Sequence, residues 1–204
     1  MPRAKQRTPE LRERVLQAAL EMLAADGVRE FTTRKIAQQA DTSTPAVYEL
    51  FGDKTGLVRD VFFEGFRALF RRLEEAQQPE DPHLELVGIM QTLRAFVSDN
   101  PVIAELMFSR PFADFDPGPG ERRAGDQVRQ LIVKSVRRCI DAGVLAGNEA
   151  DIAHVLLALA QGLARQETAG WLGTSAASRD RRWGLAIEAL VIGFGHPAEA
   201  VSRD

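Results

Sequence analysis

The sequence predicts an all-helical fold, with a small N-terminal unit followed by a larger helical part. Apolar residues recur three and four positions apart along most of the chain, as on one face of an α-helix, and no segment shows the alternation of a convincing strand. Of the 204 residues, 45% are apolar, which is enough for a larger domain with a packed core in addition to a small N-terminal unit. We place the domain boundary after residue 53, so the two parts span residues 1–53 and 54–204.

The first part contains two short helical patterns separated by a tight turn. Thr32 is placed to cap the first helix, and Ser43 is placed to cap the second. Asp41 tolerates the left-handed conformation that the turn requires, and Pro45 falls in a first helical turn, where its missing N–H costs nothing. A turn of about three to four residues between two such helices predicts a helix-turn-helix, whose second helix enters the major groove of DNA.

Several positions of this segment carry a family resemblance. They are Ile36-Ala37, Ala40, Ser43, Val47-Tyr48, Phe51, Lys54 and Leu57. This pattern resembles the N-terminal domain of TetR-type (tetracycline-repressor-like) transcriptional regulators. The preceding helix fits as well, because Asp26-Gly27 stands where the family has the glycine that ends its first helix. Two departures are Asp41, which replaces the usual turn glycine, and Glu49, which places a carboxylate in the recognition helix.

The resemblance implies a set of DNA contacts at the start of the first short helix, in the recognition helix and at the lysine after it. By position these contacts fall on Thr33, Arg34, Thr44, Pro45, Ala46, Tyr48 and Lys54. For Tyr48 we favour a phosphate contact through the hydroxyl over a half-buried core ring, and for Arg34 we favour a backbone or base contact over a solvated charge. Short side chains such as Thr44 and Ala46 favour apolar contact with a thymine methyl.

For two side chains of the recognition helix, Pro45 and Glu49, an explanation without DNA contact is available. Pro45 is accounted for as a helix-start residue, so a DNA contact by its ring follows from the resemblance alone. Glu49 can accept a hydrogen bond from a cytosine amino group or point at solvent, and we favour solvent.

The distribution of charge suggests a basic arm. The net charge of −3 argues against a general nucleic-acid coat protein. Residues 1–14 nevertheless hold five basic and two acidic residues, a net charge of +3. A basic arm ahead of a helix-turn-helix adds salt-dependent phosphate binding, and a solvated leader with no role in binding is the open alternative.

The larger part is a succession of helical patterns. We expect helices over about residues 54–77, 84–97, 102–108, 122–142, 149–170 and 180–194. The segment from Ser109 to Gly125 is rich in proline and glycine and predicts a loop.

The last two helices suggest a contact with a second copy of the chain. Between Ile152 and Leu163 nearly every residue is apolar or small, and a helix that is apolar all round must be covered on both sides. TetR-like proteins dimerise through a four-helix interface of this kind. The expected interface residues are Ile152, Val155, Leu156, Leu159, Leu163, Trp183, Ile187, Leu190, Val191 and Phe194. A twofold dimer would present two recognition helices to a palindromic operator.

In the family, the larger domain binds a small effector in a pocket among its helices and moves the two DNA-reading heads apart. The candidate lining residues here are Met90, Met107, Phe108, Phe112, Phe115, Gln161, Arg165 and Trp171. An apolar or aromatic effector would suit this set, and Met107-Phe108 with the following loop would make a lid. Any of these residues can equally be plain core.

Catalysis, metal binding and cofactors have little support. The three histidines, His83, His154 and His196, show no metal-ligand spacing, and no phosphate-binding loop or nucleophile motif stands out. Cys139 is the one cysteine, and we expect it to be a buried small hydrophobe. The absence of a signal-peptide pattern and of a run of about 18 apolar residues predicts a soluble, cytoplasmic protein with no membrane contact.

Together these features predict a homodimeric, sequence-specific, ligand-responsive DNA-binding regulator that acts as a repressor, without a metal or cofactor. One alternative is a DNA-binding regulator controlled by a protein partner instead of a small molecule. The remote alternative is an enzyme built as a helical bundle.

Overall fold

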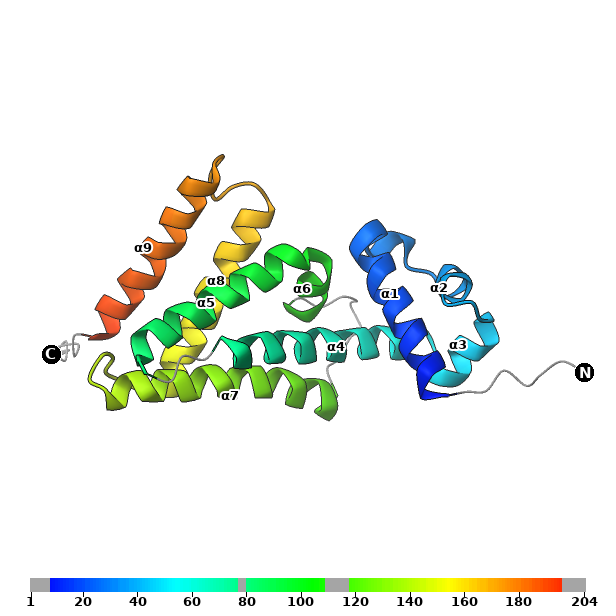
Figure 1. The fold of residues 1–204 in the computed structure, drawn as a ribbon, viewed down its shortest axis with the longest axis horizontal. Helices are drawn as coiled ribbons and strands as arrows, with labels where there is room; N and C mark the ends of the chain where they lie inside the picture. Colours follow the sequence, from blue (N-terminus) through cyan, green and yellow to red (C-terminus); the bar gives the residue numbers. More distant parts are fainter. Residues whose placement is uncertain (1–7, 77–79, 109–117, 196–204) are drawn as a thin grey trace, which may run out of the picture. The chain divides into compact units, whose positions relative to one another are not determined.

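The computed structural model describes residues 8–76, 80–108 and 118–195, and every regular element in these segments is an α-helix (Figure 1). The predicted all-helical class is therefore confirmed. The helices are α1 (Pro9–Glu30), α2 (Thr33–Gln39), α3 (Thr44–Phe51), α4 (Lys54–Glu75), α5 (Pro82–Asp99), α6 (Pro101–Phe108), α7 (Pro119–Asp141), α8 (Glu149–Thr168) and α9 (Ala176–Gly195). None of these described helices is long and apolar enough to cross a membrane.

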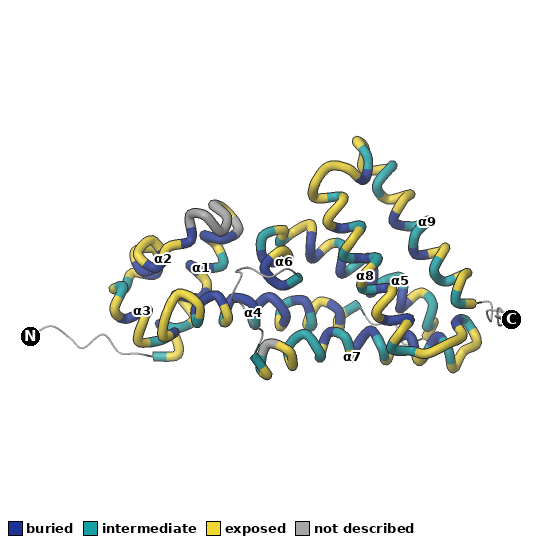
Figure 2. The backbone as a smooth tube through the Cα atoms, turned by 180° about the vertical axis from the view of Figure 1, so that it is seen from behind, coloured by how far each residue is buried: buried dark blue, intermediate teal, exposed yellow. Residues whose placement is uncertain are grey.

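The helices fall into two compact units, and their division differs from the expected boundary after residue 53. The first unit spans residues 1–67 and 100–121, and the second spans residues 68–99 and 122–204. Leu57 and Val61 of α4 and Leu106 of α6 share one apolar core with α1, α2 and α3, which explains why these segments belong to the first unit. Buried residues occur along the whole of α4, which therefore contributes to the cores of both units (Figure 2).

Close packing in the first unit depends on a glycine of α4. A Cβ atom at Gly65 would lie 2.6 Å from Sδ of Met107 and 2.9 Å from a methyl carbon of Ile103. The missing side chain thus allows α6 to pack directly against α4. On its other side α6 packs against α1.

Several helix boundaries differ from the predictions, and two of these differences involve glycine or proline. The first helix does not end at Gly27, because α1 continues to Glu30. A glycine inside a helix costs about 1 kcal/mol relative to alanine, which is small enough for the surrounding helix to offset. The loop expected up to Gly125 is also shorter, because α7 begins at Pro119. Proline suits a first helical position, where no N–H is needed.

The second unit is held together by an apolar core and by a polar cross-link. Four side chains of α5, those of Leu86, Ile89, Met90 and Leu93, are fully buried. Arg94 of α5 donates to both carboxylate oxygens of Glu167 in α8, at 2.8 and 2.7 Å, and lies 2.8 Å from Asp180 of α9. The indole N–H of Trp183 in α9 donates to Glu167 at 2.7 Å. One carboxylate therefore connects three helices, and the hydrogen bonds from Arg94 hold the pKa of Glu167 below its usual value.

Cys139 is buried as expected, and we predict that its thiol is unreactive in the folded protein. Its side chain is fully buried, and the thiol donates to the carbonyl of Pro82 at 3.1 Å. Burial, reinforced by the Glu85 carboxylate, raises the pKa of Cys139 to about 11, so almost no thiolate exists near neutral pH. A thiol reagent should label the protein in urea and leave the native protein unmodified. Stoichiometric labelling of the native protein would contradict this placement.

Candidate nucleic-acid interface

The helix-turn-helix is built by local capping interactions, as predicted. The hydroxyl of Thr32 accepts from the amide of Lys35 at 3.3 Å and caps α2, and the hydroxyl of Ser43 accepts from the amide of Ala46 at 3.3 Å and caps α3. Asp41 has a φ of +49°, so it takes the left-handed conformation that the turn requires. These contacts orient α3 relative to α2 through the short turn between them.

Tyr48 and Lys54 each contact a residue near the start of α2. Tyr48 of α3 is 45% exposed, and its hydroxyl is hydrogen-bonded to the hydroxyl of Thr33 at 3.3 Å. The ammonium of Lys54 lies 5.7 Å from the centre of the Phe31 ring, which directly precedes the cap of α2. The exposed hydroxyl of Tyr48 and the ammonium of Lys54 are groups of the kind that bind DNA phosphates.

The other predicted contact residues differ in their exposure. Arg34 and Pro45 are exposed, and Thr44 is half-buried. Ala46 is only 9% exposed and lies among the buried apolar residues of the unit. Little of its methyl group is accessible to a base, and its contact with a thymine methyl stays a prediction. Thr33 is 8% exposed, and its hydroxyl is already bonded to Tyr48.

The junction of α3 and α4 contains two residues that the sequence reasoning missed. The carboxylate of Asp53 accepts from the amide of Gly56 at 2.7 Å, which caps α4. A Cβ atom at Gly56 would lie 1.9 Å from the carbonyl oxygen of Phe51. Only glycine allows so close an approach, so this pair fixes where α4 begins and where Lys54 stands. These residues could have been predicted from the sequence, because an aspartate three positions before a glycine at a helix start indicates a helix cap.

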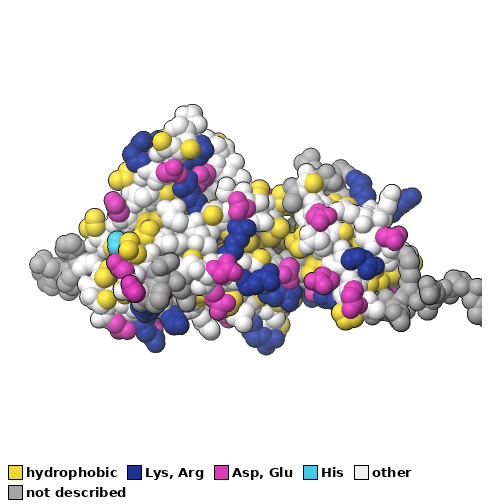
Figure 3. Space-filling view, viewed as in Figure 1, with side chains coloured by type: hydrophobic (Ala, Val, Ile, Leu, Met, Phe, Trp, Pro, Cys, Tyr) yellow, Lys and Arg dark blue, Asp and Glu magenta, His cyan; other side chains and the backbone are white. Residues whose placement is uncertain are grey.

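Residues 9–14 of the expected basic arm belong to α1. Residues 1–7 lie outside the described residues, and α1 already begins at Pro9. Within α1, Arg12 pairs with Asp60 at 2.5 Å and lies 4.9 Å from the centre of the Phe51 ring. Arg12 therefore joins α1 to α3 and α4. On the face shown in Figure 3, acidic and basic side chains are interspersed over both units.

The residues predicted to bind an effector do not gather within one unit. Met107 and Phe108 belong to the first unit, whereas Met90, Gln161, Arg165 and Trp171 belong to the second. Met90 is fully buried in the core, while Trp171 is 79% exposed. Phe112 and Phe115 lie outside the described residues. That these residues line one effector pocket stays a prediction.

Four of the predicted interface residues lie inside the protomer. Ile152, Leu156, Trp183 and Ile187 are at most 2% exposed and face the core of the second unit, so we reassign them to that core. The same helices carry other apolar side chains at the surface. Val155 is 41% exposed, and Leu185 and Ile192, which the prediction did not include, are 58% and 62% exposed. The predicted Leu159, Leu163, Leu190, Val191 and Phe194 belong to the same two helices and are not part of the buried core.

The fold and the capped helix-turn-helix define the chain as a helix-turn-helix DNA-binding regulator, and comparison with known protein families assigns it to one of them. Residues 15–61 match the model for bacterial regulatory proteins of the tetR family, and residues 86–190 match the model for the tetracyclin repressor-like C-terminal domain. The chain belongs to the TetR family. It is therefore a DNA-binding transcriptional regulator and a member of a non-enzymatic family. Across the described segments, no group of three His, Cys, Asp or Glu side chains is arranged to hold a metal ion.

The chain is also similar to individual proteins, one of which is named as an HTH-type transcriptional regulator. The chain is 26% identical over 148 residues to the uncharacterized HTH-type transcriptional regulator YvkB of Bacillus subtilis, a match that covers 72% of this chain and 77% of YvkB. It is 34% identical over 98 residues to the nucleoid occlusion factor SlmA of Vibrio vulnificus. That second match spans 47% of this chain and half the length of SlmA.

Solved structures share the fold at low sequence identity. A protein of unknown function from Rhodococcus sp. RHA1 matches with a TM-score of 0.81 and 23% identity, over 96% of this chain and all of the other. A single-residue variant of TetR from Acinetobacter baumannii AYE, solved in complex with minocycline, matches with a TM-score of 0.62 and 20% identity, over 88% of this chain and 93% of the other. Identities this low support the shared fold alone.

Proposed function

We propose that the protein is a ligand-responsive repressor that binds a palindromic operator as a homodimer and is released from it by a small effector with an apolar or aromatic body. The observation that carries the DNA-binding half of this proposal is the exposed Tyr48 of the recognition helix, whose hydroxyl is hydrogen-bonded to that of Thr33 in α2 at 3.3 Å. Tyr48 and Lys54 bind phosphates on either side of the groove. Thr44 and Pro45, at the start of α3, then face the base edges, and Arg34 reaches the backbone or a base from α2.

Selection of bound fragments from a random double-stranded DNA pool, at near-physiological salt, tests this function directly. The double variant Tyr48→Ala, Lys54→Ala serves as the control. An inverted repeat recovered with the natural protein and lost with the variant is the expected result. Failure to enrich any sequence would contradict a free-standing sequence-specific repressor.

Lys54→Ala gives a quantitative prediction for the same interface. Because a phosphate contact carries no base information, the change should weaken binding to all sequences alike and lower the slope of log affinity against log salt by about one unit. Fluorescence anisotropy over a salt series measures both quantities. Arg123→Ala in α7 removes one exposed charge from the second unit and should leave the slope unchanged. An unchanged slope in Lys54→Ala would show that this lysine does not reach DNA.

The surface apolar residues of α8 and α9 support the dimer. Val155, Leu185 and Ile192 are exposed on these two helices. Added Cβ atoms at Gly162, Gly184 and Gly193 of the same helices would meet nothing within 4 Å, so a partner helix has room to approach closely. Val155→Arg with Ile192→Arg should convert the protein from dimer to monomer in sedimentation velocity. Leu84→Arg, on Leu84 of α5, which is 59% exposed, is the control variant and should stay dimeric.

Release by an effector is supported by a structural neighbour of the same fold, the TetR variant solved in complex with minocycline. An effector that favours a domain state in which the two heads no longer match the operator lowers DNA affinity by the coupling free energy, typically about 1–3 kcal/mol. The recovered operator provides the probe for an effector screen. A compound that displaces the probe and raises the melting temperature of the protein supports this step.

Control by a protein partner is the second candidate. It is favoured by the match to SlmA proteins, which are named for nucleoid occlusion and not for a ligand. Under this alternative the operator is recovered as before, and no small molecule in the screen displaces it.

A further inference from the structure

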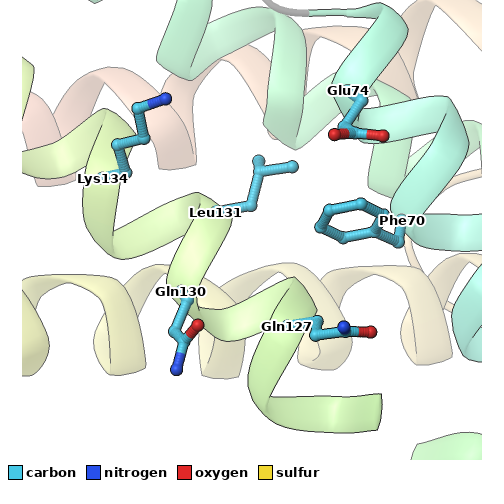
Figure 4. Close-up of a pocket in the computed structure, with 6 residues that line it drawn as sticks. All are labelled: Phe70, Glu74, Gln127, Gln130, Leu131 and Lys134. Atoms are coloured by element: carbon cyan, nitrogen blue, oxygen red, sulfur yellow. The ribbon is translucent and has the colours of Figure 1, made fainter.

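A cavity of about 340 Å³ that is open to solvent lies between α4 and α7 within the second unit (Figure 4), and the charged and amide side chains of its rim are exposed. This volume is in the lower part of the range of small-molecule sites, about 300–1,000 Å³. The lining residues are Phe70 and Glu74 of α4 and Gln127, Gln130, Leu131 and Lys134 of α7. On each helix these positions recur at a spacing of three or four, so each helix presents one continuous wall. None of them was among the effector-binding residues predicted from the sequence.

The cavity contains two opposite charges that do not meet. Glu74 and Lys134 lie on opposite walls, and the side chain of Leu131 projects between them (Figure 4). Neither charge has an ion-pair or hydrogen-bond partner among the described residues. Elsewhere in the same unit charges are joined, as in Arg72 with Asp99 at 2.8 Å. The two walls are thus complementary to a ligand that carries both signs of charge.

The neutral lining suits the remainder of such a ligand. Phe70 is half-buried and lies one helical turn before Glu74, so a ring face and a carboxylate are available together. An ammonium group is attracted both to a carboxylate and to the face of an aromatic ring. On the opposite wall, Gln127 and Gln130 add amide donors to the ammonium of Lys134, and these are partners for a carboxylate. Leu131, only 6% exposed, provides the apolar floor.

We propose that this cavity binds a small zwitterion, with an ammonium group held by Glu74 and Phe70, a carboxylate held by Lys134, and an apolar or aromatic body over Leu131. The proposal that this molecule is the effector rests on the proposed function. Its physical basis is that α4 is one continuous helix, which begins at Lys54 and carries Glu74 in its last turn. A ligand that joins α4 to α7 therefore acts on the helix that carries a proposed phosphate contact.

Calorimetric titration of the full-length protein tests the cavity without DNA. The probes are two zwitterions of different length, 4-(aminomethyl)benzoate and 6-aminohexanoate, and the singly charged benzylamine and benzoate. At least one zwitterion should bind about tenfold more tightly than either singly charged probe. Failure of both zwitterions to bind at millimolar concentration, or equal binding of all four probes, would overturn the proposal.

Variants assign the charges within the cavity. Glu74→Gln should weaken binding of the zwitterion and of benzylamine about tenfold and leave the affinity for benzoate unchanged. Lys134→Gln should weaken binding of benzoate about tenfold and leave the affinity for benzylamine unchanged. Glu75→Gln, at the next position of α4 and outside the cavity, is the matched control and should change nothing. Equal losses in Glu74→Gln and Glu75→Gln would point to a diffuse charge effect and overturn the site. Unchanged melting temperatures confirm that the variants are folded.

The cavity and the proposed function fail in different ways. If the zwitterion binds and the DNA selection recovers no operator, the proposed binding site is supported and the proposed repressor function is contradicted. If a compound instead releases the operator and binds equally well to the Glu74→Gln and Lys134→Gln variants, that result supports the repressor and contradicts the proposal that the cavity is its effector site.

Discussion

Replacement of Trp183 by alanine is expected to destabilise the second unit by about 3–5 kcal/mol, because it removes the largest fully buried side chain and leaves a cavity. The same change deletes the indole N–H that donates to Glu167. It also removes the ring that lies 5.3 Å from the guanidinium of Arg94. Since these contacts fix α9 against α5 and α8, the loss should appear as a lower midpoint in urea unfolding followed by circular dichroism.

The two tryptophans of the chain provide a matched pair for this measurement. Trp171 is 79% exposed, so Trp171→Ala should change the free energy of unfolding by no more than about 0.5 kcal/mol. Trp183→Phe keeps a buried ring and loses the N–H, and should cost about 1–3 kcal/mol. In the Trp171→Ala variant the remaining fluorescence should come from the buried indole of Trp183 and should therefore be blue-shifted. Equal stability losses for Trp171→Ala and Trp183→Ala would contradict the placement of α9.

The sign of the pH dependence at this cross-link follows from Glu167. Arg94 lowers the pKa of this carboxylate in the folded protein, so the ionised form is favoured by folding. The link therefore contributes stability at neutral pH, above the pKa of the unfolded chain, and loses it as the pH falls through the lowered pKa. Glu167→Gln should reduce the acid dependence of unfolding in this range.

The sequence predicted the helix-turn-helix well because its determinants are local. A cap such as Thr32 or Ser43 acts on an amide three residues away, and the left-handed conformation of Asp41 is a property of that residue type. Such features can be read from a few neighbouring letters, and the structure reproduces them.

The proposed dimer interface and the proposed effector site were harder to predict because both depend on contacts between distant segments. An apolar stripe on α9 shows that a face is covered, and it does not show whether the cover is the same chain or a partner. Trp183 faces the core of its own unit, whereas Leu185, two residues later, is exposed. Similarly, Phe70 was one of many helical aromatic residues, and only the separation of α4 from α7 makes it part of a cavity.

Gly56 was missed although its contacts are local, and its replacement by alanine is expected to have the largest effect on the DNA-binding unit. The added Cβ atom would lie 1.9 Å from the carbonyl oxygen of Phe51, a backbone atom that no side-chain rotation can move. The junction of α3 and α4 must shift, at a cost of about 1–3 kcal/mol in unfolding free energy. Because Lys54 lies in this junction, affinity for the selected operator should fall by about tenfold or more in the fraction that remains folded.

Gly88→Ala separates this steric effect from the ordinary helix preference for alanine. A Cβ atom at Gly88 of α5 would meet only a backbone oxygen at 3.7 Å, which is an ordinary contact. That variant should be stabilised by about 0.5–1 kcal/mol and bind operator normally. Thermal unfolding and fluorescence anisotropy on both variants make the comparison. If Gly56→Ala also gained stability and bound operator normally, the close approach of Phe51 to the start of α4 would have no part in positioning the DNA-binding residues.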